Sequence, residues 1–418
     1  MREMKDSGVP WIGNIPVDWQ LVSVKRLFSI GRGRVIAQTE LKETGYPVYS
    51  SQTKDNGCLG YIDTYDYDYP QLTWTTDGAN AGAIFLRTGY YNCTNVCGTL
   101  NPNDVLVDLR YQKYALEHIA YNERRVDTNG YKIMNNEMAI IKTLLPPLSV
   151  QHQIADYLDS KCTQIDTIIA KEQSVIEKLQ EYKRAIITQA ITRGLNSSTE
   201  MKKTGLEWID MIPEYWNVKK IKYLTSKIGS GKTPKGGSDV YIDEGILFIR
   251  SQNVYDGYFD LSSAVFISHE IDCTMSNTRV YRDDVLLNIT GGSIGRSCLY
   301  ESDELANVNQ HVCIIRCNGQ MRPKFMQYFW NSSIGKTSID IYQSGANREG
   351  LNFFEIGNTV VPTPELDEQN QIIDYLDDKC DVIDKVISQK LTIIDTLAEY
   401  KRSLIYEVVT GKKEVPNV

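Results

Sequence analysis

The stretch IGSGKTP at residues 228–234 comes nearest to a known chemistry, that of a phosphate-binding loop. A Gly-rich turn followed by Lys and Thr can cradle a triphosphate with backbone N–H groups and hold Mg²⁺ with the hydroxyl. Such a loop requires Gly, four residues and then Gly-Lys-(Ser/Thr), but position 226 is Ser. Pro234 and the pair Gly236-Gly237 also interrupt the helix that the loop must open. The stretch therefore does not predict nucleotide binding.

Thiol chemistry is a second possibility, because the nine cysteines include the spacings Cys93/Cys97 and Cys313/Cys317. The chain has no CxxC pair and only four histidines, so the ligand spacings of a zinc site are missing and we expect no metal. The amino-methyltransferase signature (Asp/Asn/Ser)-Pro-Pro-aromatic is also absent. The nearest stretches, residues 101–103 and 145–148, do not fit it. We therefore assign no catalytic residue and expect mostly buried, reduced thiols.

Composition sets the broad class of the protein. The net charge of −8 argues against a generally basic nucleic-acid binder, although local basic patches can still contact phosphates. No apolar run approaches the ~20 residues of a membrane span, and the N-terminal residues are too polar for a signal peptide. We expect a cytoplasmic protein with no membrane partner.

The sequence contains an internal repeat. Residues 11–27 reappear at 208–224 with an offset of 197, and residues 151–166 reappear at 369–384 with an offset of 218. These near-copies frame two inserts, about 30–145 and 227–360, which share only scattered short matches. A constant frame around different inserts predicts one scaffold that carries two different readers.

The second repeated block reads as a long helix in each copy. Residues from about 150 to 193 contain no Pro or Gly, and apolar side chains recur every three to four residues. This pattern favours an antiparallel coiled coil between the two copies, with an internal pseudo-twofold axis. Each helix would be about 66 Å long. The alternative is that they are core helices of two separate globular domains.

The inserts are rich in short β-type stretches interrupted by Gly, Asn and Asp, with occasional helical patches. The predicted fold class is therefore α+β, with two mixed α/β domains joined by two long antiparallel helices. We place the first recognition domain at residues 1–148, the first helix at 149–196, the second domain at 197–364, and the second helix with its tail at 365–418.

Loops of the inserts hold the candidate DNA contacts. Ser51-Gln52 matches Ser251-Gln252, and a Gly-x-x-x-Gly loop occurs in both inserts. Each insert also has a Gly-x-Gly-basic stretch, whose basic residue is Arg34 in the first and Lys232 in the second. Asn and Gln can bond adenine in two places, and Arg or Lys can bond guanine likewise. The first insert offers Gln52, Lys54, Asn56, Thr76, Asn80 and Arg87, besides Arg34 as a phosphate contact. The second offers Arg250, Gln252, Asn253, Thr290, Ser293, Arg296, Asn309, Gln310, Asn347 and Arg348, besides Lys232.

The doubled frame resembles the specificity subunit of type I restriction–modification systems. The elements that carry the resemblance are a WxxxIPxxW start at residues 11–19 and 208–216, a PxPxxEQ-like helix start at 362–369, and a TG-like stop at 410–411. The first copy departs from this pattern, because Val150 stands where the second copy has Glu368, and its stop reads Thr192-Arg193-Gly194.

The resemblance implies a non-catalytic subunit that binds double-stranded DNA. Each recognition domain would read one half of a bipartite, asymmetric site, and the paired helices would set the gap between the halves. The scaffold would bind two modification subunits, which carry S-adenosylmethionine and methylate adenine. Restriction/translocase subunits, which use ATP and Mg²⁺, would join that complex, and this chain would bind no cofactor. The alternative is a coiled-coil scaffold or adaptor without sequence-specific DNA binding.

Overall fold

The computed structural model describes residues 2–103, 106–128, 130–206, 208–344 and 350–416. Contacts between residues divide the chain into two units. The first unit comprises Met1–Glu172 with Leu391–Val418, and the second comprises Gln173–Lys390. Each unit thus combines one insert with parts of both long helices. The four segments inferred from the sequence divide the chain differently from these two units, and their bounds stay a prediction.

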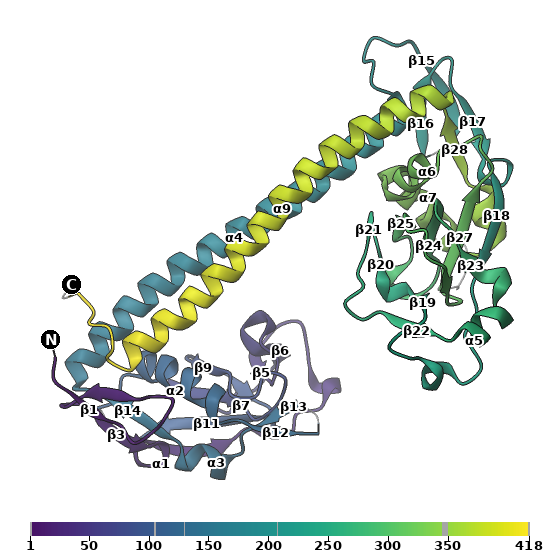
Figure 1. Ribbon diagram of the computed structural model, residues 1–418. Helices are drawn as coiled ribbons and strands as arrows, with labels where there is room; N and C mark the ends of the chain where they lie inside the picture. The colour runs from purple at the N-terminus through teal and green to yellow at the C-terminus, as the bar shows by residue number, and fades with distance from the viewer. Residues whose placement is uncertain (1, 104–105, 129, 207, 345–349, 417–418) are drawn as a thin grey trace. The chain divides into compact units, whose positions relative to one another are not determined.

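The two long helices are α4 (Leu148–Arg193) and α9 (Leu366–Val409), and they lie side by side within each unit (Figure 1). In the first unit the start of α4 packs against the end of α9, and in the second unit the end of α4 packs against the start of α9. The pair is therefore antiparallel, as predicted. The buried contacts come from Ile154, Leu158, Leu404 and Val408 in the first unit, and from Ala190, Ile191, Ile372 and Leu376 in the second.

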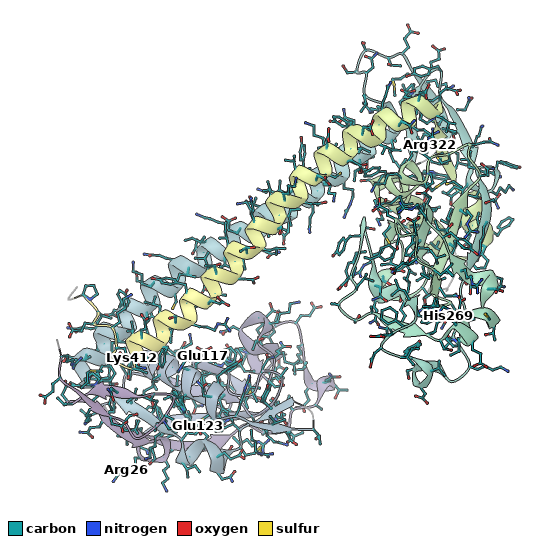
Figure 2. All side chains as sticks on the ribbon, in the orientation of Figure 1. Arg26, Glu117, Glu123, His269, Arg322 and Lys412 are labelled. Carbon is teal, nitrogen blue, oxygen red and sulfur yellow. The ribbon has the colours of Figure 1, made fainter. Side chains whose placement is uncertain are left out.

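A glutamine fixes the start of each helix by side-chain hydrogen bonds to the backbone, three for Gln151 and two for Gln369. The Gln151 side-chain oxygen accepts from the Asp108 backbone N–H, and its amide donates to the carbonyls of Leu106 and Pro146. Gln369 accepts from the Arg322 N–H at 2.8 Å and donates to the Pro364 carbonyl at 2.9 Å; Arg322 is labelled in Figure 2. Both glutamines are buried, and each joins a long helix to the domain beside it.

The first unit is built on a four-stranded antiparallel sheet. Its strands, in order, are β4 (Phe28–Arg32), β11 (Cys97–Pro102), β7 (Gln71–Thr75) and β9 (Ile84–Arg87). A three-stranded sheet has the order β10 (Asn92–Cys93), β5 (Tyr46–Tyr49) and β6 (Cys58–Ile62), and β10 pairs with β5 in parallel. Helices α1 (Val24–Leu27), α2 (Leu109–Glu123) and α3 (Asn135–Ile140) contribute to the core.

The second unit repeats this plan with different side chains. Its main sheet has the order β18 (Thr225–Ser230), β27 (Val312–Cys317), β24 (Asp284–Asn288) and β25 (Ser297–Leu299), again antiparallel throughout. The other sheet has the order β22 (Val265–Ile267), β19 (Ile246–Ile249), β26 (Ala306–Val308) and β23 (Arg279–Val280), with β19 and β26 parallel. The helices are α5 (His269–Thr274), α6 (Pro323–Asn331), α7 (Ser333–Ser344) and α8 (Phe353–Asn358).

Small two-stranded sheets from the repeated frame complete each unit. The first unit pairs β1 (Met4–Asp6) with β2 (Asn14–Pro16) and β3 (Gln20–Ser23) with β14 (Lys142–Leu145). The second pairs β15 (Met201–Leu206) with β16 (Ile209–Pro213) and β17 (Asn217–Lys220) with β28 (Val360–Thr363). Two hairpins differ between the units: β12 (Arg125–Asp127) with β13 (Gly130–Lys132), which joins β8 (Asp77–Gly78), and β20 (Val254–Tyr255) with β21 (Tyr258–Phe259).

Candidate nucleic-acid interface

In both units the Gly-x-Gly-basic stretch passes very close to another backbone segment at the same place in the fold. We call this close approach the crossing. Gly31 pairs with Thr99 of β11, and Gly229 pairs with Ile314 of β27, so the two stretches occupy equivalent ends of β4 and β18. A Cβ at Gly33, the second glycine of the first stretch, would lie 2.2 Å from the Cys93 carbonyl oxygen. At Gly231 it would lie 1.6 Å from the Val308 carbonyl oxygen. Close backbone approach therefore requires both glycines.

The surroundings of Gly231 also differ from those of a phosphate loop. Strand β18 runs through Ser230, and the next helical element is a short 3-10 turn at Gly237–Val240. Between residues 231 and 268, all of which the structure describes, no α-helix opens from the loop to present its N-terminal N–H groups.

The basic residues that follow these glycines are exposed, and each has an internal partner. The Arg34 Nε lies 2.9 Å from an oxygen of Asp66, and the Lys232 Nζ donates to the Thr274 carbonyl at 2.9 Å. The exposed Arg34–Asp66 ion pair is weak, typically below about 1 kcal/mol, and an exposed hydrogen bond such as that of Lys232 contributes about as little. A phosphate group can therefore replace either partner at small cost.

Beyond Lys232, three loops of the second unit bring polar side chains into one hydrogen-bonded chain. The Thr233 hydroxyl bonds the Gln310 side-chain oxygen, and the Gln310 amide lies 3.0 Å from His311 Nε2. The other ring nitrogen of His311 bonds the Thr290 hydroxyl. Thr290 and Gln310 were predicted contacts, whereas no feature of the sequence singled out His311. We call these four residues the polar chain of the second unit.

The equivalent positions of the first unit carry different chemistry. Cys97 pairs with Thr75 in the first unit as Val312 pairs with Asn288 in the second, so Val96 corresponds to His311 and Asp77 to Thr290. By the same registers Val35 takes the place of Thr233, and Asn95 that of Gln310. Val35 is 73% exposed. One topological place thus presents hydroxyl, amide and imidazole groups in one unit, whereas the other keeps the amide and has two valines and an aspartate at the remaining positions.

The matched Ser-Gln pairs lie after equivalent strands, β5 and β19. The exposed Gln252 donates to the Ser263 hydroxyl at 3.0 Å, and Arg250 donates to the Ser263 carbonyl at 2.6 Å. The half-buried Gln52 instead donates into its own loop, to the Cys58 carbonyl. Gln252 can therefore give up its hydrogen bond to the Ser263 hydroxyl and bond the edge of a DNA base. The Gln52 amide instead holds its own loop through the Cys58 carbonyl.

Burial overturns three of the predicted contacts. Thr76 is 0% exposed and donates to the Val96 carbonyl, and Asn253 is 1% exposed and caps its own turn by accepting from the Arg250 N–H. Arg87 is 1% exposed, with its guanidinium 3.6 Å from the centre of the Tyr49 ring, and burial lowers its pKa. These side chains cannot reach DNA in this structure, so their role is to hold the loops.

The other predicted contacts fall into two groups. Exposed or half-buried side chains remain candidates, namely Lys54, Asn56, Asn80, Ser293, Arg296 and Asn309. Among these, the Arg296 guanidinium lies 4.5 Å from the centre of the Tyr255 ring. Asn347 and Arg348 lie outside the residues that the structure describes.

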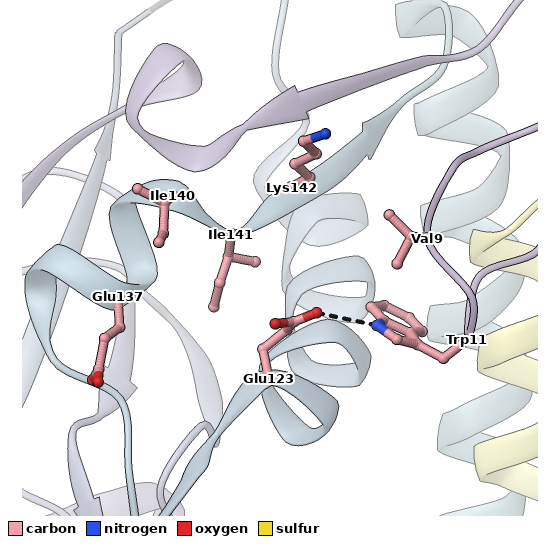
Figure 3. A pocket seen from close by; sticks show the side chains of 7 residues that line it. All are labelled: Val9, Trp11, Glu123, Glu137, Ile140, Ile141 and Lys142. Atoms are coloured by element: carbon pink, nitrogen blue, oxygen red, sulfur yellow. Dashed lines mark hydrogen bonds between the residues drawn. The ribbon is translucent and has the colours of Figure 1, made fainter.

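A cavity of about 310 Å³ in the first unit is lined by Trp11 of the frame and by residues of the first insert, among them Glu123 and Lys142 (Figure 3). Trp11 lines it and donates its indole N–H to Glu123 at 3.1 Å. Among the described residues, no three His, Cys, Asp or Glu side chains form a group that could hold a metal ion. Nor does any described helix have the length and apolar character needed to cross a membrane.

Paired sheets and differing loops on a repeated frame define a class of protein with two variable domains on one scaffold. The sequence matches the family "Type I restriction modification DNA specificity domain" twice, over residues 16–178 and 213–394, and the chain belongs to this family.

Relatives match nearly the whole chain. The EcoBI specificity subunit of Escherichia coli is 28% identical over 95% of this chain and 87% of its own length. The MjaVIII specificity subunit of Methanocaldococcus jannaschii is 26% identical over 97% and 92%. A solved structure described as "Structural basis underlying complex assembly and conformational transition of the type I R-M system" has a TM-score of 0.68 at 12% identity, over 96% and 99%. That likeness supports the fold.

Proposed function

We propose that this chain is the sequence-specific DNA-binding subunit of a type I restriction–modification complex in the cytoplasm. The observation that carries the proposal is the polar chain of the second unit and its replacement at the same topological place in the first. Two readers on one plan, with different hydrogen-bonding groups, suit two different half-sites. The target is therefore bipartite and asymmetric, with one half read by each unit.

The long helices support a spacing role. Helix α4 has 46 residues and α9 has 44, so each is about 65–70 Å long at 1.5 Å per residue. Half-sites one DNA turn apart are separated by about 34 Å. Removing two heptads from both helices shortens each by about 21 Å and preserves the apolar register. We expect a shorter gap in the recognised sequence or loss of binding, and an unchanged gap would refute the spacing role.

Exposed repeated residues on these helices suit a partner that binds twice. The motif Glu-Tyr-Lys-Arg occurs at 181–184 on α4 and at 399–402 on α9. The lysines form internal ion pairs with Asp384 and Asp166. Tyr182 and Tyr400, in contrast, are 58% and 51% exposed. We assign the exposed Glu, Tyr and Arg of each motif to the docking of one modification subunit.

This docking assignment predicts stoichiometry. Changing Tyr182 and Arg184 to Ala leaves one of the two motifs, so the complex should retain one modification subunit in place of two, measured by native mass spectrometry. The matched change at Tyr400 and Arg402 should have the same effect, and changing both motifs should release both copies. Retention of two copies after the double change would exclude these residues from docking.

The chain itself acts without catalysis in this proposal. The modification subunits carry S-adenosylmethionine and methylate adenine, and restriction subunits supply ATP- and Mg²⁺-dependent chemistry. The direct test is genome-wide mapping of methylated adenines in cells with and without this gene. Loss of one bipartite motif supports the proposal, and no loss when the partners are expressed contradicts it. Replacing residues 30–145 by another family member's insert should change one half-site only.

A further inference from the structure

Arg124 stands out because two tyrosine rings contact it and, within the part of the chain that the structure describes, its side chain has no polar partner. Its guanidinium carbon lies 3.8 Å from the centre of the Tyr121 ring and 3.8 Å from that of Tyr131. Among the described residues, no hydrogen bond or ion pair of its side chain is present. Ring stacking attracts a guanidinium by its face and leaves the N–H groups at its edge free to donate.

The neighbouring arginine behaves in the opposite way. Arg125 donates from Nε to Glu137 at 2.6 Å and also lies 3.7 Å from Asp127. Its charge is therefore compensated within the chain. The two adjacent arginines differ in that one has its donors satisfied and the other has its position fixed with its donors unused.

The stacked arginine lies beside a predicted reading loop. Tyr131 pairs with Gly78, the first residue of the Gly78–Gly82 loop that also holds Asn80. At the other end of the loop, a Cβ at Gly82 would lie 3.2 Å from the backbone of Ala120 on α2. Arg124 directly follows α2 and precedes β12, so its position is tied to both ends of the loop.

The exposed surroundings suit a large polar ligand. Tyr121 is 59% exposed and Tyr131 is 37% exposed, and Val126, which pairs with Tyr131, is 80% exposed. If the stack served only to brace the hairpin, these rings would be expected to be more buried. An ordered guanidinium with unused donors binds a pair of acceptor atoms with little further loss of side-chain entropy.

We propose that Arg124 is a DNA contact of the first unit, pre-positioned by Tyr121 and Tyr131 to donate two parallel hydrogen bonds. This inference rests on the proposed DNA-binding function. The acceptor pair is either the O6/N7 edge of a guanine or two oxygens of a phosphate, because both accept from the guanidinium fork. Lysine keeps the positive charge but lacks the fork, so Arg124→Lys tests the geometry directly.

The experiment uses the full chain co-purified with its methyltransferase partner and a randomised DNA duplex library, with bound sequences counted. With a guanine contact, Arg124→Lys lowers the preference for guanine at one position of one half-site by about tenfold or more. With a phosphate contact, Arg124→Ala weakens binding to all sequences equally and lowers the slope of log K against log salt by about one. Either result supports the proposal and identifies the acceptor.

Three controls separate the possible failures. Arg125→Lys should leave every base preference unchanged, since that side chain is already paired. Tyr131→Leu should reproduce the effect of Arg124→Lys in weaker form, with Arg124 still present. If the Arg124 variants bind and select as the wild type does and only their melting temperature falls, Arg124 is a structural brace and the inference is wrong. A wild-type complex that selects no sequence would instead contradict the proposed function itself.

Discussion

The two units anchor their frame tryptophans in opposite ways. In the first unit Trp11 donates to Glu123, whereas the indole N–H of Trp19 is buried with no partner among the described residues. In the second unit Trp216 donates to Glu368 at 2.9 Å, whereas the Trp208 indole N–H is the one that has no partner within the described part of the chain. Each copy of the WxxxIPxxW frame therefore satisfies one tryptophan and leaves the other unsatisfied.

This difference shows which contacts the frame requires. Val150 replaces Glu368 in the first unit, so a side-chain hydrogen bond was exchanged for an apolar contact without loss of the fold. The glutamine beside it, Gln151 or Gln369, keeps its hydrogen bonds to the backbone in both units. Buried backbone groups must be paired, and no apolar residue can do this. The frame is thus held by backbone pairing, and individual side-chain anchors vary.

The largest predicted effect concerns a feature that both units share, the second glycine of the crossing. Gly231→Ala places a Cβ against the Val308 carbonyl and should destabilise the second unit by about 3 kcal/mol or more. Gly229→Ala is the matched control, because its Cβ meets nothing within 4 Å. Thermal unfolding combined with hydrogen exchange locates the loss. Equal stability of the two variants would contradict the crossing.

Glu368→Val copies the first unit's residue into the second. It leaves the buried Trp216 indole, and the Tyr215 hydroxyl at 2.8 Å, without their acceptor. An unsatisfied buried donor costs about 1–3 kcal/mol, and denaturant unfolding should show a loss of this size. Glu368→Gln keeps an acceptor oxygen and should retain most of the stability. If Val and Gln at this position are equivalent, the hydrogen bond has no energetic role.

The reverse exchange, Val150→Glu, supplies an acceptor to Trp19. A cavity of about 170 Å³ is lined by both residues, by the basic Arg2 and Lys413, and by the acidic Glu414, so it gives the carboxylate room and more basic than acidic neighbours. We expect a gain of about 1 kcal/mol. The same change in a Trp19→Phe chain should give no gain, because phenylalanine has no N–H. A double-mutant cycle measures the difference, and equal gains in both backgrounds would argue against pairing.

The sequence predicted the antiparallel helices, the α+β class and the repeated frame because these depend on periodicity and on the chain's own duplication. It did not reveal that the divergent inserts share a sheet order, since strand pairing is set by contacts distant in sequence. The match of Ile30–Arg34 to Ile228–Lys232 was one of three local clues, and strand register confirms it.

Individual site residues were harder to predict because exposure is a tertiary property. Arg87 has the residue type of a DNA contact, yet it packs under Tyr49 in the interior. Arg124 follows a helix in an unremarkable sequence, and only the fold brings its guanidinium within 3.8 Å of the ring centres of both Tyr121 and Tyr131. His311 likewise bonds Thr290 and Gln310, and Gln310 bonds Thr233. No spacing in the sequence indicates that these residues meet.

The smallest predicted effect tests the symmetry of the helix pair. Lys183 lies 2.6 Å from Asp384, and Lys401 lies 2.7 Å from Asp166, with similar exposure in both pairs. Half-exposed ion pairs contribute about 0.2–1 kcal/mol and are screened by salt. Lys183→Met and Lys401→Met should therefore lower stability equally and slightly in low salt, less in 1 M salt, and additively together. Methionine retains the apolar stem, so the comparison isolates the charge. A cost at one site several times that at the other would mean that the pseudo-twofold contacts, although alike in geometry, differ in energy.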